Sequence, residues 1–477
     1  MAAKNMLIIM SDEHSFETAG CYGHPIVQTP NIDRLAARGT RFTNAYTPSP
    51  ICVPTRAAIQ TGRHVHEIGA WDSASPYAGS PPSWGHEVIN AGRRSVSIGK
   101  LHFRSREDDN GFDPEIVPMH VVNGVGWISG LLRDELPPNA DPSREYAEMI
   151  GPGGSTYVDY DEKVCAAACE WLQTDAVASN VPWTAFVSMV APHYPLTPPK
   201  RFFDLYPPDE MDAPRDPLAY ERHPFLKMFR EFWNFEDYFT PESRNVARAS
   251  YYGLISYMDD NVGKILAALE ASGAAEDTLV VYTSDHGDMI GNHGFWAKCT
   301  MYEDSAGVPL VLAGPGVDEG TVVDDPCSLL DLYPTVLDVA RVEPQLDPAP
   351  RAGVSLLKAA RGEADGRTIL SEYHDGGCKS GFYMVRWDNW KYIDYLNYPP
   401  QLFDLDTDPL ELNDLGQSEA HKDRVAEGRR RLEMFLDPEE TNARALKEQA
   451  AKVREHGGRE ALLNLGTFGY TPIEGST

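Results

Sequence analysis

Several polar side chains in this sequence directly follow short apolar runs, where a parallel sheet presents its functional groups. Residues 6–10 form a wholly apolar run that ends at Asp12 and Glu13, and the run 279–283 is followed at once by Ser-Asp-His-Gly-Asp. Ligands of open parallel sheets bind beyond the carboxyl ends of the strands. The residues expected to meet there are Asp12, Glu13, Lys100, His102, His193, Asp285, His286 and Asp288.

Two kinds of chemistry are expected from such a set. Carboxylates with one histidine suit a hard divalent cation such as Ca²⁺, Mg²⁺ or Mn²⁺. Lysines and histidines beside the cation would hold an anion and exchange protons with it. Any one of these residues alone more often serves a turn or a helix cap, so the convergence of four strand ends is what favours a site.

Cys52 lies in Ile51-Cys-Val-Pro-Thr-Arg56, at the opening of a helix predicted over residues 55–62, just after Pro54. A cysteine at a helix N-terminus has its negative charge stabilised and can be reactive. The same helix start can hold an oxyanion. Arg56 follows one turn later, where its guanidinium can clamp a charged group with two hydrogen bonds.

The elements that must position these residues are strands alternating with helices. This alternation predicts a mostly parallel sheet covered by helices on both faces, an α/β fold. Strands are expected over residues 6–10, 41–46, 95–99, 184–190, 279–283 and 308–313, and helices over 29–39, 55–62, 245–272 and 329–340.

The pattern changes after about residue 365. Short strands are predicted over 368–373, 382–387, 390–395 and 401–405, with a hairpin turn at 387–390 and a charged helix over 420–435. We therefore expect a catalytic α/β domain over 1–365. A small antiparallel-sheet subdomain with a helix and an oligomerisation tail is expected over 366–477.

Composition limits the class of protein and its partners. The chain has 477 residues, 42% of them hydrophobic, which excludes a fully disordered chain. The formal net charge of −29 disfavours nucleic acid and anionic membranes as partners. The first apolar run is too short for a secretory signal, and no run reaches the length of a membrane span, so a cytoplasmic location is expected. The seven cysteines form no disulfide or zinc framework.

The motif Cys-x-Pro-x-Arg at 52–56 is the core signature of the sulfatase family, within the alkaline phosphatase superfamily. The chain resembles that family in further segments and in the family's order: TPNIDRLAARGTRFTNAY, AAIQTGRH, GKLHF, APHYPLTPP, YMDDNVGKIL, YTSDHGDMIGNHGFWAK and QLFDLDTDPLELNDL. The resemblance covers roughly residues 6–415 and implies an alkaline-phosphatase-like fold. The pair Asp285-His286 resembles the choline-sulfatase and phosphonate-monoester-hydrolase branch, since many sulfatases have Asn at the second position.

The resemblance also implies a mechanism. Cys52 matches the residue that a formylglycine-generating enzyme oxidises to formylglycine, so this enzyme is an expected partner during maturation. The aldehyde would hydrate to a geminal diol, and one hydroxyl would attack the sulfur of a small sulfate ester. Loss of the proton from the second hydroxyl would then expel sulfate. Thr55 replaces the serine commonest in the motif but retains a hydroxyl, so maturation is expected.

Site residues are carried over position by position. Asp12, Asp285, His286 and an oxygen of the modified Cys52 match metal ligands, with Ca²⁺ the first choice and Mg²⁺ or Mn²⁺ as alternatives. Arg56 would hold the formylglycine, and Lys100 and Lys298 would contact the sulfate oxygens. His102 would take the proton that triggers sulfate release, and His193 would protonate the leaving oxygen. Open assignments are direct metal binding by Glu13, a supporting role for Asp288, and places near the site for His14, His64, His66 and His293.

Alternatives remain for the substrate and for two segments. Aryl and alkyl sulfates are both open; a phosphonate monoester or phosphodiester hydrolase and an inactive, ligand-binding relative are the other hypotheses. The aromatic residues spaced through 225–239 would either pack as a helix face or line an apolar or cation–π pocket, and 197–245 would be an insertion or lid. The apolar stretch at 463–472 is predicted to pack on a neighbouring subunit, giving a homodimer or homotetramer.

Overall fold

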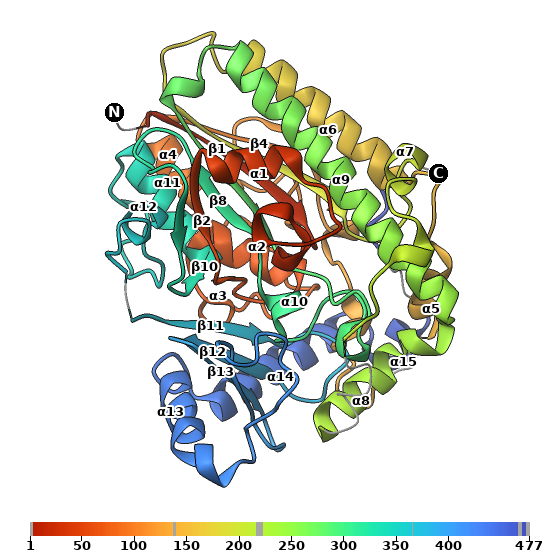
Figure 1. The fold of residues 1–477 in the computed structure, drawn as a ribbon. Helices are drawn as coiled ribbons and strands as arrows, with labels where there is room; N and C mark the ends of the chain where they lie inside the picture. The colour runs from red at the N-terminus through yellow and green to blue at the C-terminus, as the bar shows by residue number, and fades with distance from the viewer. Residues whose placement is uncertain (1–2, 137–139, 216–222, 365, 466–469, 474–477) are drawn as a thin grey trace.

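The computed structural model describes residues 3–136, 140–215, 223–364, 366–465 and 470–473 (Figure 1). Its main sheet has eight strands in the order β5-β4-β6-β1-β7-β8-β2-β9. The three central strands β6 (Trp183–Pro192), β1 (Asn5–Asp12) and β7 (Thr278–Ser284) are parallel to one another. β4 (Arg94–Lys100) and β5 (Glu115–Met119) extend this parallel set on one side. The predicted α/β architecture is confirmed.

The far side of the sheet contains one reversed strand. β8 (Leu310–Ala313) is antiparallel to both of its neighbours, β7 and β2 (Gly39–Phe42). β9 (Thr321–Val323) then pairs parallel with β2 at the edge. The sheet is therefore mostly parallel, and the strands that carry the expected site residues all belong to the parallel part.

Alternate side chains of β1 enter two separate cores. Leu7 and Ile9 pack into the core formed with α1 (Pro30–Ala37), α6 (Thr156–Gln173) and α9 (Pro241–Ala271). Met6 and Ile8 pack into the core on the opposite face, formed with α2 (Cys52–Thr61), α4 (Trp84–Asn90) and α11 (Leu332–Ala340). Because successive side chains of a strand point to opposite faces, a wholly apolar run is what a strand covered on both sides requires.

Two element boundaries differ from the predictions. The expected strand 41–46 is divided into β2 and β3 (Ala45–Tyr46), and β3 pairs with β10 (Cys327–Ser328). At the break, Thr43 Oγ1 and Asn44 Nδ2 donate hydrogen bonds to Asp324, at 2.7 and 2.6 Å; such local side-chain bonds compete with a strand ladder. Helix α2 begins at Cys52 and not after Pro54, because a proline in the first helical turn loses no intrahelical hydrogen bond.

The C-terminal part contains an antiparallel sheet that lies below the main sheet in Figure 1. Its strands are β11 (Thr368–Tyr373), β12 (Phe382–Trp387), β13 (Trp390–Tyr395) and β14 (Gln401–Asp404), with the expected hairpin turn between β12 and β13. Helix α13 (Lys422–Leu432) packs on β12 and β13. Helices α14 (Pro438–Glu455) and α15 (Gly458–Leu463) return to the catalytic part, where both contact the turn Ile128–Leu131.

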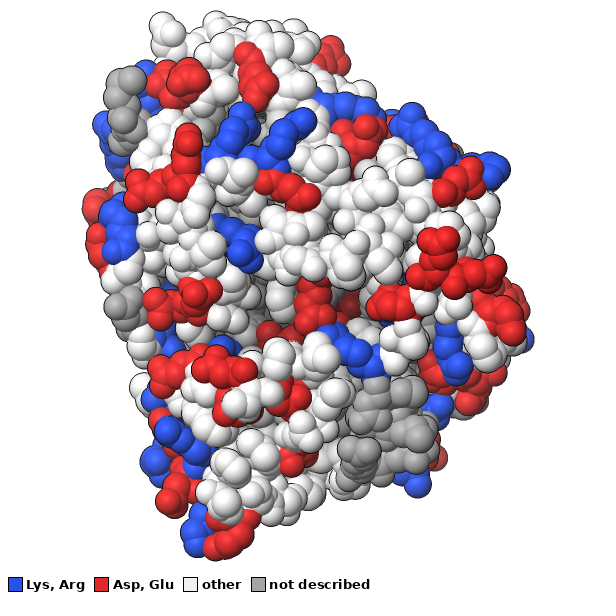
Figure 2. Space-filling view, in the orientation of Figure 1, with Lys and Arg blue, Asp and Glu red and all other residues white. Residues whose placement is uncertain are grey.

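The remaining helices are α3 (Val65–Ile68), α5 (Ala140–Glu148), α7 (Lys200–Phe203), α8 (Pro224–Trp233), α10 (Glu303–Ala306) and α12 (Leu356–Ala359); α7 packs on α9, and α12 packs on α11. None of the helices in the described ranges is long and apolar enough to cross a membrane. On the face drawn in Figure 2, basic and acidic side chains are interspersed, and no continuous basic surface is visible there.

Candidate active site

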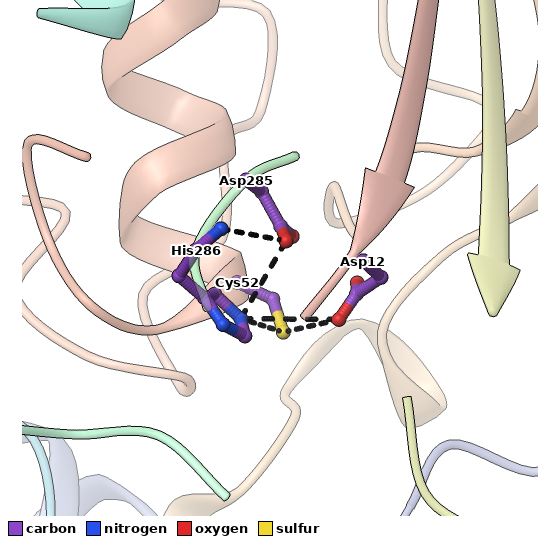
Figure 3. Close-up of side chains that lie close together, drawn as sticks. All are labelled: Asp12, Cys52, Asp285 and His286. Atoms are coloured by element: carbon purple, nitrogen blue, oxygen red, sulfur yellow. Dashed lines mark hydrogen bonds and ion pairs between the residues drawn. The ribbon is translucent and has the colours of Figure 1, made fainter. Parts of the chain in front are cut away.

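The carboxyl edge of the parallel strands gathers the expected metal ligands. Asp12 is the last residue of β1, Asp285 and His286 follow β7, and Cys52 is the first residue of α2. Their side chains point toward one another (Figure 3), and one ligand atom from each lies within 4.8 Å of the others. Cys52 Sγ lies 3.0 Å from His286 Nε2 and 3.5 Å from Asp12 Oδ1. All four residues are buried.

The orientation of His286 suits a metal ligand. Its Nδ1 lies 3.0 Å from the carbonyl oxygen of Gly287, so Nδ1 carries the proton and the lone pair of Nε2 points toward Cys52. A backbone carbonyl that fixes the tautomer of a ligating histidine is a common feature of metal sites. Two carboxylates, one imidazole and the side chain of residue 52 thus form a donor set that fits a divalent cation with oxygen preference.

Arg56 connects the two carboxylates of this donor set. Its guanidinium donates to Asp285 Oδ2 at 2.9 Å and to Asp12 Oδ2 at 3.1 Å. It also donates at 2.9 Å to the hydroxyl of Ser188 and to the carbonyl of Lys100. With only 2% of the side chain exposed, Arg56 fixes the ends of β1, β4, β6 and β7 relative to helix α2.

Two lysines add positive charge near Cys52. Lys100 Nζ lies 2.6 Å from Asp12 Oδ2, and Lys298 Nζ lies 3.4 Å from Cys52 Sγ. Burial would raise the pKa of Asp12, but Lys100, His193, Arg56 and Lys298 together hold it well below its usual range. Asp12 is therefore an anion, as a metal ligand must be. The pocket supplies locally the positive charge that the acidic chain lacks as a whole.

The unmodified Cys52 thiol is not activated by its helix start. Burial, followed by the nearby Asp12 carboxylate, raises the pKa of the thiol to about 12, against the opposing effect of Lys298 and Lys100. The helix N-terminus therefore does not lower the pKa of this thiol below its ordinary value. Burial against a carboxylate outweighs the helix terminus.

Thr55 anchors the turn that precedes Cys52. Its hydroxyl shares a 2.7 Å hydrogen bond with Thr47 Oγ1 and accepts one of 3.1 Å from the amide of Ser49. It also bonds the carbonyl of Ser49. The hydroxyl at this position thus holds the turn from 47 to 51 on the first turn of α2. A threonine serves this purpose as well as a serine would.

Glu13 lies beside the donor set and contacts cations. Its Oε2 lies 3.1 Å from Lys298 Nζ and 3.4 Å from His193 Nε2. It is absent from the group of ligand atoms around Cys52, although Asp12, Glu13 and His193 form a second close group. Burial raises the pKa of Glu13 to about 7, against Lys298, which lowers it. Its geometry is that of a partner for Lys298 and His193.

His102 and His193 are both buried against the cationic groups. Burial, with Lys100 and Arg56, lowers the pKa of His102 well below its usual range, and burial with Lys298 does the same for His193. Both imidazoles are therefore neutral. His193 Nδ1 lies 2.5 Å from the carbonyl of Tyr194, and His102 Nε2 lies 3.1 Å from Thr471 Oγ1.

Above these groups lies a cavity of about 160 Å³ with an aromatic wall. Cys52, Glu13, His102, His193 and Lys298 lie at its polar end. Its rings are close-packed: Tyr146 stacks on Tyr194 at 4.9 Å, for example. The aromatic wall consists of Trp127, Tyr146, Tyr157, Tyr194, Trp233, Phe235, Trp296 and Tyr470.

The other open assignments resolve as supporting positions. Asp288 accepts hydrogen bonds from Tyr146 Oη at 3.3 Å and from the amide of Ile290 at 2.7 Å. His293 stacks on Tyr302, and His14 contacts the hydroxyl of Tyr282 at 2.7 Å. None of these side chains lines the cavity. His64 and His66 stack on each other beside Glu372, also away from the cavity.

The aromatic segment 225–239 serves both of the roles considered for it. Phe225 and Phe229 are buried against the C-terminal sheet, through Phe382 for example, whereas Trp233 and Phe235 line the cavity. Sequence reasoning missed the other members of the wall. Tyr194 and Trp296 stand inside the quoted motifs APHYPLTPP and GNHGFWAK, so their position beside His193 and Lys298 was a usable signal. Trp127, Tyr146 and Tyr157 carry no comparable signal.

The chain's last described segment contacts the cavity. Tyr470 and Thr471 line it, and the buried rings of Tyr157 and Tyr194 offer Tyr470 an aromatic surface. That the stretch 463–472 packs on a neighbouring subunit stays a prediction. Residues 466–469 of that stretch lie outside the described residues.

Comparisons with known proteins agree with this geometry. The sulfatase family model matches residues 4–342, and a model described as N-sulphoglucosamine sulphohydrolase, C-terminal, matches residues 291–437. A choline-sulfatase of Rhizobium meliloti is 31% identical over 87% of this chain and 82% of its own length. An arylsulfatase K of Danio rerio is 30% identical over 86% of this chain and 80% of its own.

Solved structures share the fold. The phosphonate monoester hydrolase of Agrobacterium radiobacter superposes with a TM-score of 0.73 at 23% identity, over 91% of this chain and 95% of its own. At this identity the likeness speaks for the fold alone. Taken with the family match over most of the catalytic part, it leads to one conclusion: this chain belongs to the sulfatase family and is a sulfuric ester hydrolase.

Proposed function

We propose that the chain hydrolyses sulfate monoesters with an aryl or alkyl leaving group, using a formylglycine made from Cys52 and one divalent metal ion. The observation that carries this proposal is the position of Cys52. Its side chain lies between a metal-type donor set, two lysines and an aromatic cavity. A formylglycine at this position would supply a hydrated aldehyde, whose two hydroxyls permit covalent catalysis and release.

Asp12, Asp285, His286 and the modified residue 52 would hold the metal. When bound, such a cation lowers the pKa of an attached oxygen and neutralises anionic oxygens of the substrate. Ca²⁺ is our first choice, with Mg²⁺ and Mn²⁺ as alternatives, since two buried carboxylates suit any of these hard divalent cations. Arg56 keeps both carboxylates aligned, through the hydrogen bonds described above.

The remaining polar residues would act on the substrate itself. Lys298 and Lys100 would bind the sulfate oxygens, because Lys298 contacts Cys52 at the polar end of the cavity and Lys100 lies 2.6 Å from Asp12 beside it. His193 would pass a proton from Nε2 to the leaving oxygen. Because the imidazole is neutral and its Nδ1 faces the carbonyl of Tyr194, that proton has to reach Nε2 first. Glu13 would supply it, since its Oε2 lies 3.4 Å from Nε2 and burial raises its pKa to about 7. His102, a neutral imidazole at the same end, would accept the proton when sulfate is released.

The aromatic wall selects the leaving group. Rings of Trp, Tyr and Phe favour an aryl group by stacking and a quaternary ammonium group by cation–π attraction. Both fit a cavity whose wall carries so many rings. The sequence similarity to a choline-sulfatase and to arylsulfatase K supports one candidate of each kind.

Phosphonate monoester or phosphodiester hydrolysis is the second candidate. The Asp285-His286 pair resembles that of choline-sulfatases and of phosphonate monoester hydrolases alike, and the same lysines would accept either tetrahedral anion. The inactive-relative hypothesis is disfavoured, since the complete donor set and all expected cations converge.

A comparison of kcat/KM values separates these candidates. Enzyme whose residue 52 is verified as formylglycine by mass spectrometry would be assayed on an aryl sulfate, choline sulfate, an aryl phosphonate monoester and a phosphodiester. We expect one of the two sulfates to give the highest value. A higher value for the phosphonate or the diester would replace the proposal by its alternative.

A further inference from the structure

The last described residues of the chain form part of the active-site cavity. Tyr470 and Thr471 line the same cavity as Cys52 and Lys298. The family models end at residues 342 and 437, well before them. Neither residue belongs to the motifs quoted above, so only their contacts indicate what they do.

Several contacts dock this segment on the catalytic part. Tyr157 Oη, from helix α6, donates a hydrogen bond of 2.8 Å to the carbonyl of Thr471. The ring of Tyr470 lies 5.3 Å from that of Tyr157 and 5.6 Å from that of Tyr194, edge-on to both. Tyr157 and Tyr194 are each only 3% exposed. The segment thus completes a wall whose other members are already fixed by the core.

Thr471 also engages a proposed proton carrier. Its Oγ1 lies 3.1 Å from His102 Nε2. The other ring nitrogen of His102, Nδ1, is buried and has no hydrogen-bond partner among the described residues. His102 itself adopts a left-handed backbone conformation, with φ at 55°, which a non-glycine residue adopts only when its surroundings hold it there. Thr471 is therefore the side chain that sets which way the imidazole of His102 points.

We propose that Tyr470 and Thr471 are specificity and positioning residues for the active site of their own chain. Thr471 orients His102 and occupies its Nε2, which leaves Nδ1 as the nitrogen that exchanges a proton. Tyr470 closes the aromatic wall and restricts the size and shape of the leaving group. This inference rests on the sulfatase activity proposed above, because it gives two further residues roles in the same active site.

Point variants test the two roles separately. Thr471→Val keeps the shape and removes the hydroxyl, so kcat should fall by about 3- to 10-fold on every sulfate ester while KM changes little. Thr471→Ser should restore kcat. Tyr470→Ala should raise KM for an aryl sulfate and leave KM for a small alkyl sulfate nearly unchanged. Thr174→Val, on an exposed end of α6, is the matched control and should not alter either constant.

A second experiment tests whether the tail serves the active site of its own subunit, by combining two variants that are each inactive or impaired. A chain that ends at Leu465 would be co-expressed with full-length Cys52→Ala, and the mixed oligomers, if any form, would be assayed. If the tail serves its own subunit, the mixture should be no more active than the shortened chain alone. Recovery of activity would show that the tail acts across subunits and would overturn the inference.

The wild-type assay keeps the two proposals apart. Wild-type enzyme that carries formylglycine but cleaves no sulfate ester would refute the proposed function. Wild-type activity that is unchanged in Thr471→Val, in Tyr470→Ala and in the shortened chain would refute only the role of the tail.

Discussion

The two ends of the cavity differ in where their residues come from. At the polar end, Asp12, Lys100 and Asp285 stand at or just after the carboxyl ends of β1, β4 and β7, and Cys52 begins α2. At the aromatic end, the rings come from the helices α5 and α6 and the last residue of α8, and also from connecting loops and the tail. Rigid elements give the precision that chemistry requires, and loops give variable contacts with substrates.

The ends also differ in how their polar groups are compensated. At the polar end, each buried charge has a partner, as in the contacts of Asp12 with Lys100 and Arg56. Removing one partner there leaves another charge buried and unpaired, which is costly. Rings at the aromatic end make van der Waals and edge contacts with one another. We therefore expect variants of the polar end to impair all substrates and variants of the aromatic end to depend on the leaving group.

Substitution of Cys52 should have the largest effect. Cys52→Ala removes the side chain from which the nucleophile is made, so kcat should fall by about 10⁴-fold or more on every ester. Cys169→Ala, a half-buried cysteine on α6, is the matched control and should retain full activity. Turnover by Cys52→Ala at the wild-type rate would refute the nucleophile assignment.

Removal of the divalent metal should come next. Prolonged chelation should abolish most of the activity on sulfates and on phosphorus esters alike, and Ca²⁺, Mg²⁺ or Mn²⁺ should restore it in an order that identifies the metal. A free metal concentration one hundred times the Kd should also raise the free energy of unfolding by about 2.7 kcal/mol. Thermal melting with and without the metal checks this. An unchanged Tm together with unchanged activity after verified metal removal would contradict the site.

Neutralising one lysine should have a smaller effect that is uniform across substrates. Lys298→Met should lower kcat/KM by about 10²- to 10³-fold, the usual result of removing one preorganised electrostatic contact. The decrease should be similar for aryl sulfate and choline sulfate, because Lys298 contacts the polar end. Lys227→Met, at an exposed position of α8, serves as the control. A loss of kcat/KM confined to substrates with one leaving group would show that Lys298 contacts the leaving group and not the sulfate.

The smallest of these effects should be selective. Trp127→Ala should raise KM by about 2- to 30-fold for the preferred leaving group, since one cation–π or stacking contact contributes about 0.5–2 kcal/mol. A small alkyl sulfate should be nearly unaffected, and Trp127→Phe should have an intermediate effect. Trp390→Ala, on β13 and away from the cavity, controls for general loss of aromatic packing. Equal losses for all substrates would mean that the wall supports the chemistry itself.

The polar end was predictable from sequence because strand ends follow simple rules. An apolar run followed by acidic residues marks a buried strand and its carboxyl edge, and this placed Asp12 and Asp285 together. Lys298 lies in a loop and does not follow a strand, so only the family motifs could predict it. The antiparallel sheet after Thr368 was equally accessible, since its short strands and the turn at 387–390 have local signals.

What sequence could not provide is equally specific. The left-handed backbone of Glu13 and His102 depends on tertiary contacts, and so does the high pKa of the Cys52 thiol, which burial determines. The aromatic wall joins residues as distant in sequence as Trp127 and Tyr470. No periodic pattern links them, because loops and a chain end bring them together. The start of α2 was predicted after Pro54, but the helix begins at Cys52, since the first helical turn tolerates a proline that later turns would not.

The most direct test of the account is one ratio of kcat/KM values on wild-type enzyme whose Cys52 peptide carries formylglycine by mass spectrometry. The ratio compares the better of aryl sulfate and choline sulfate with the better of an aryl phosphonate monoester and a phosphodiester. We predict a ratio well above one, with the loss of both activities in Cys52→Ala. A ratio well below one would contradict the assignment of sulfate esters as the substrates while leaving the nucleophile in place.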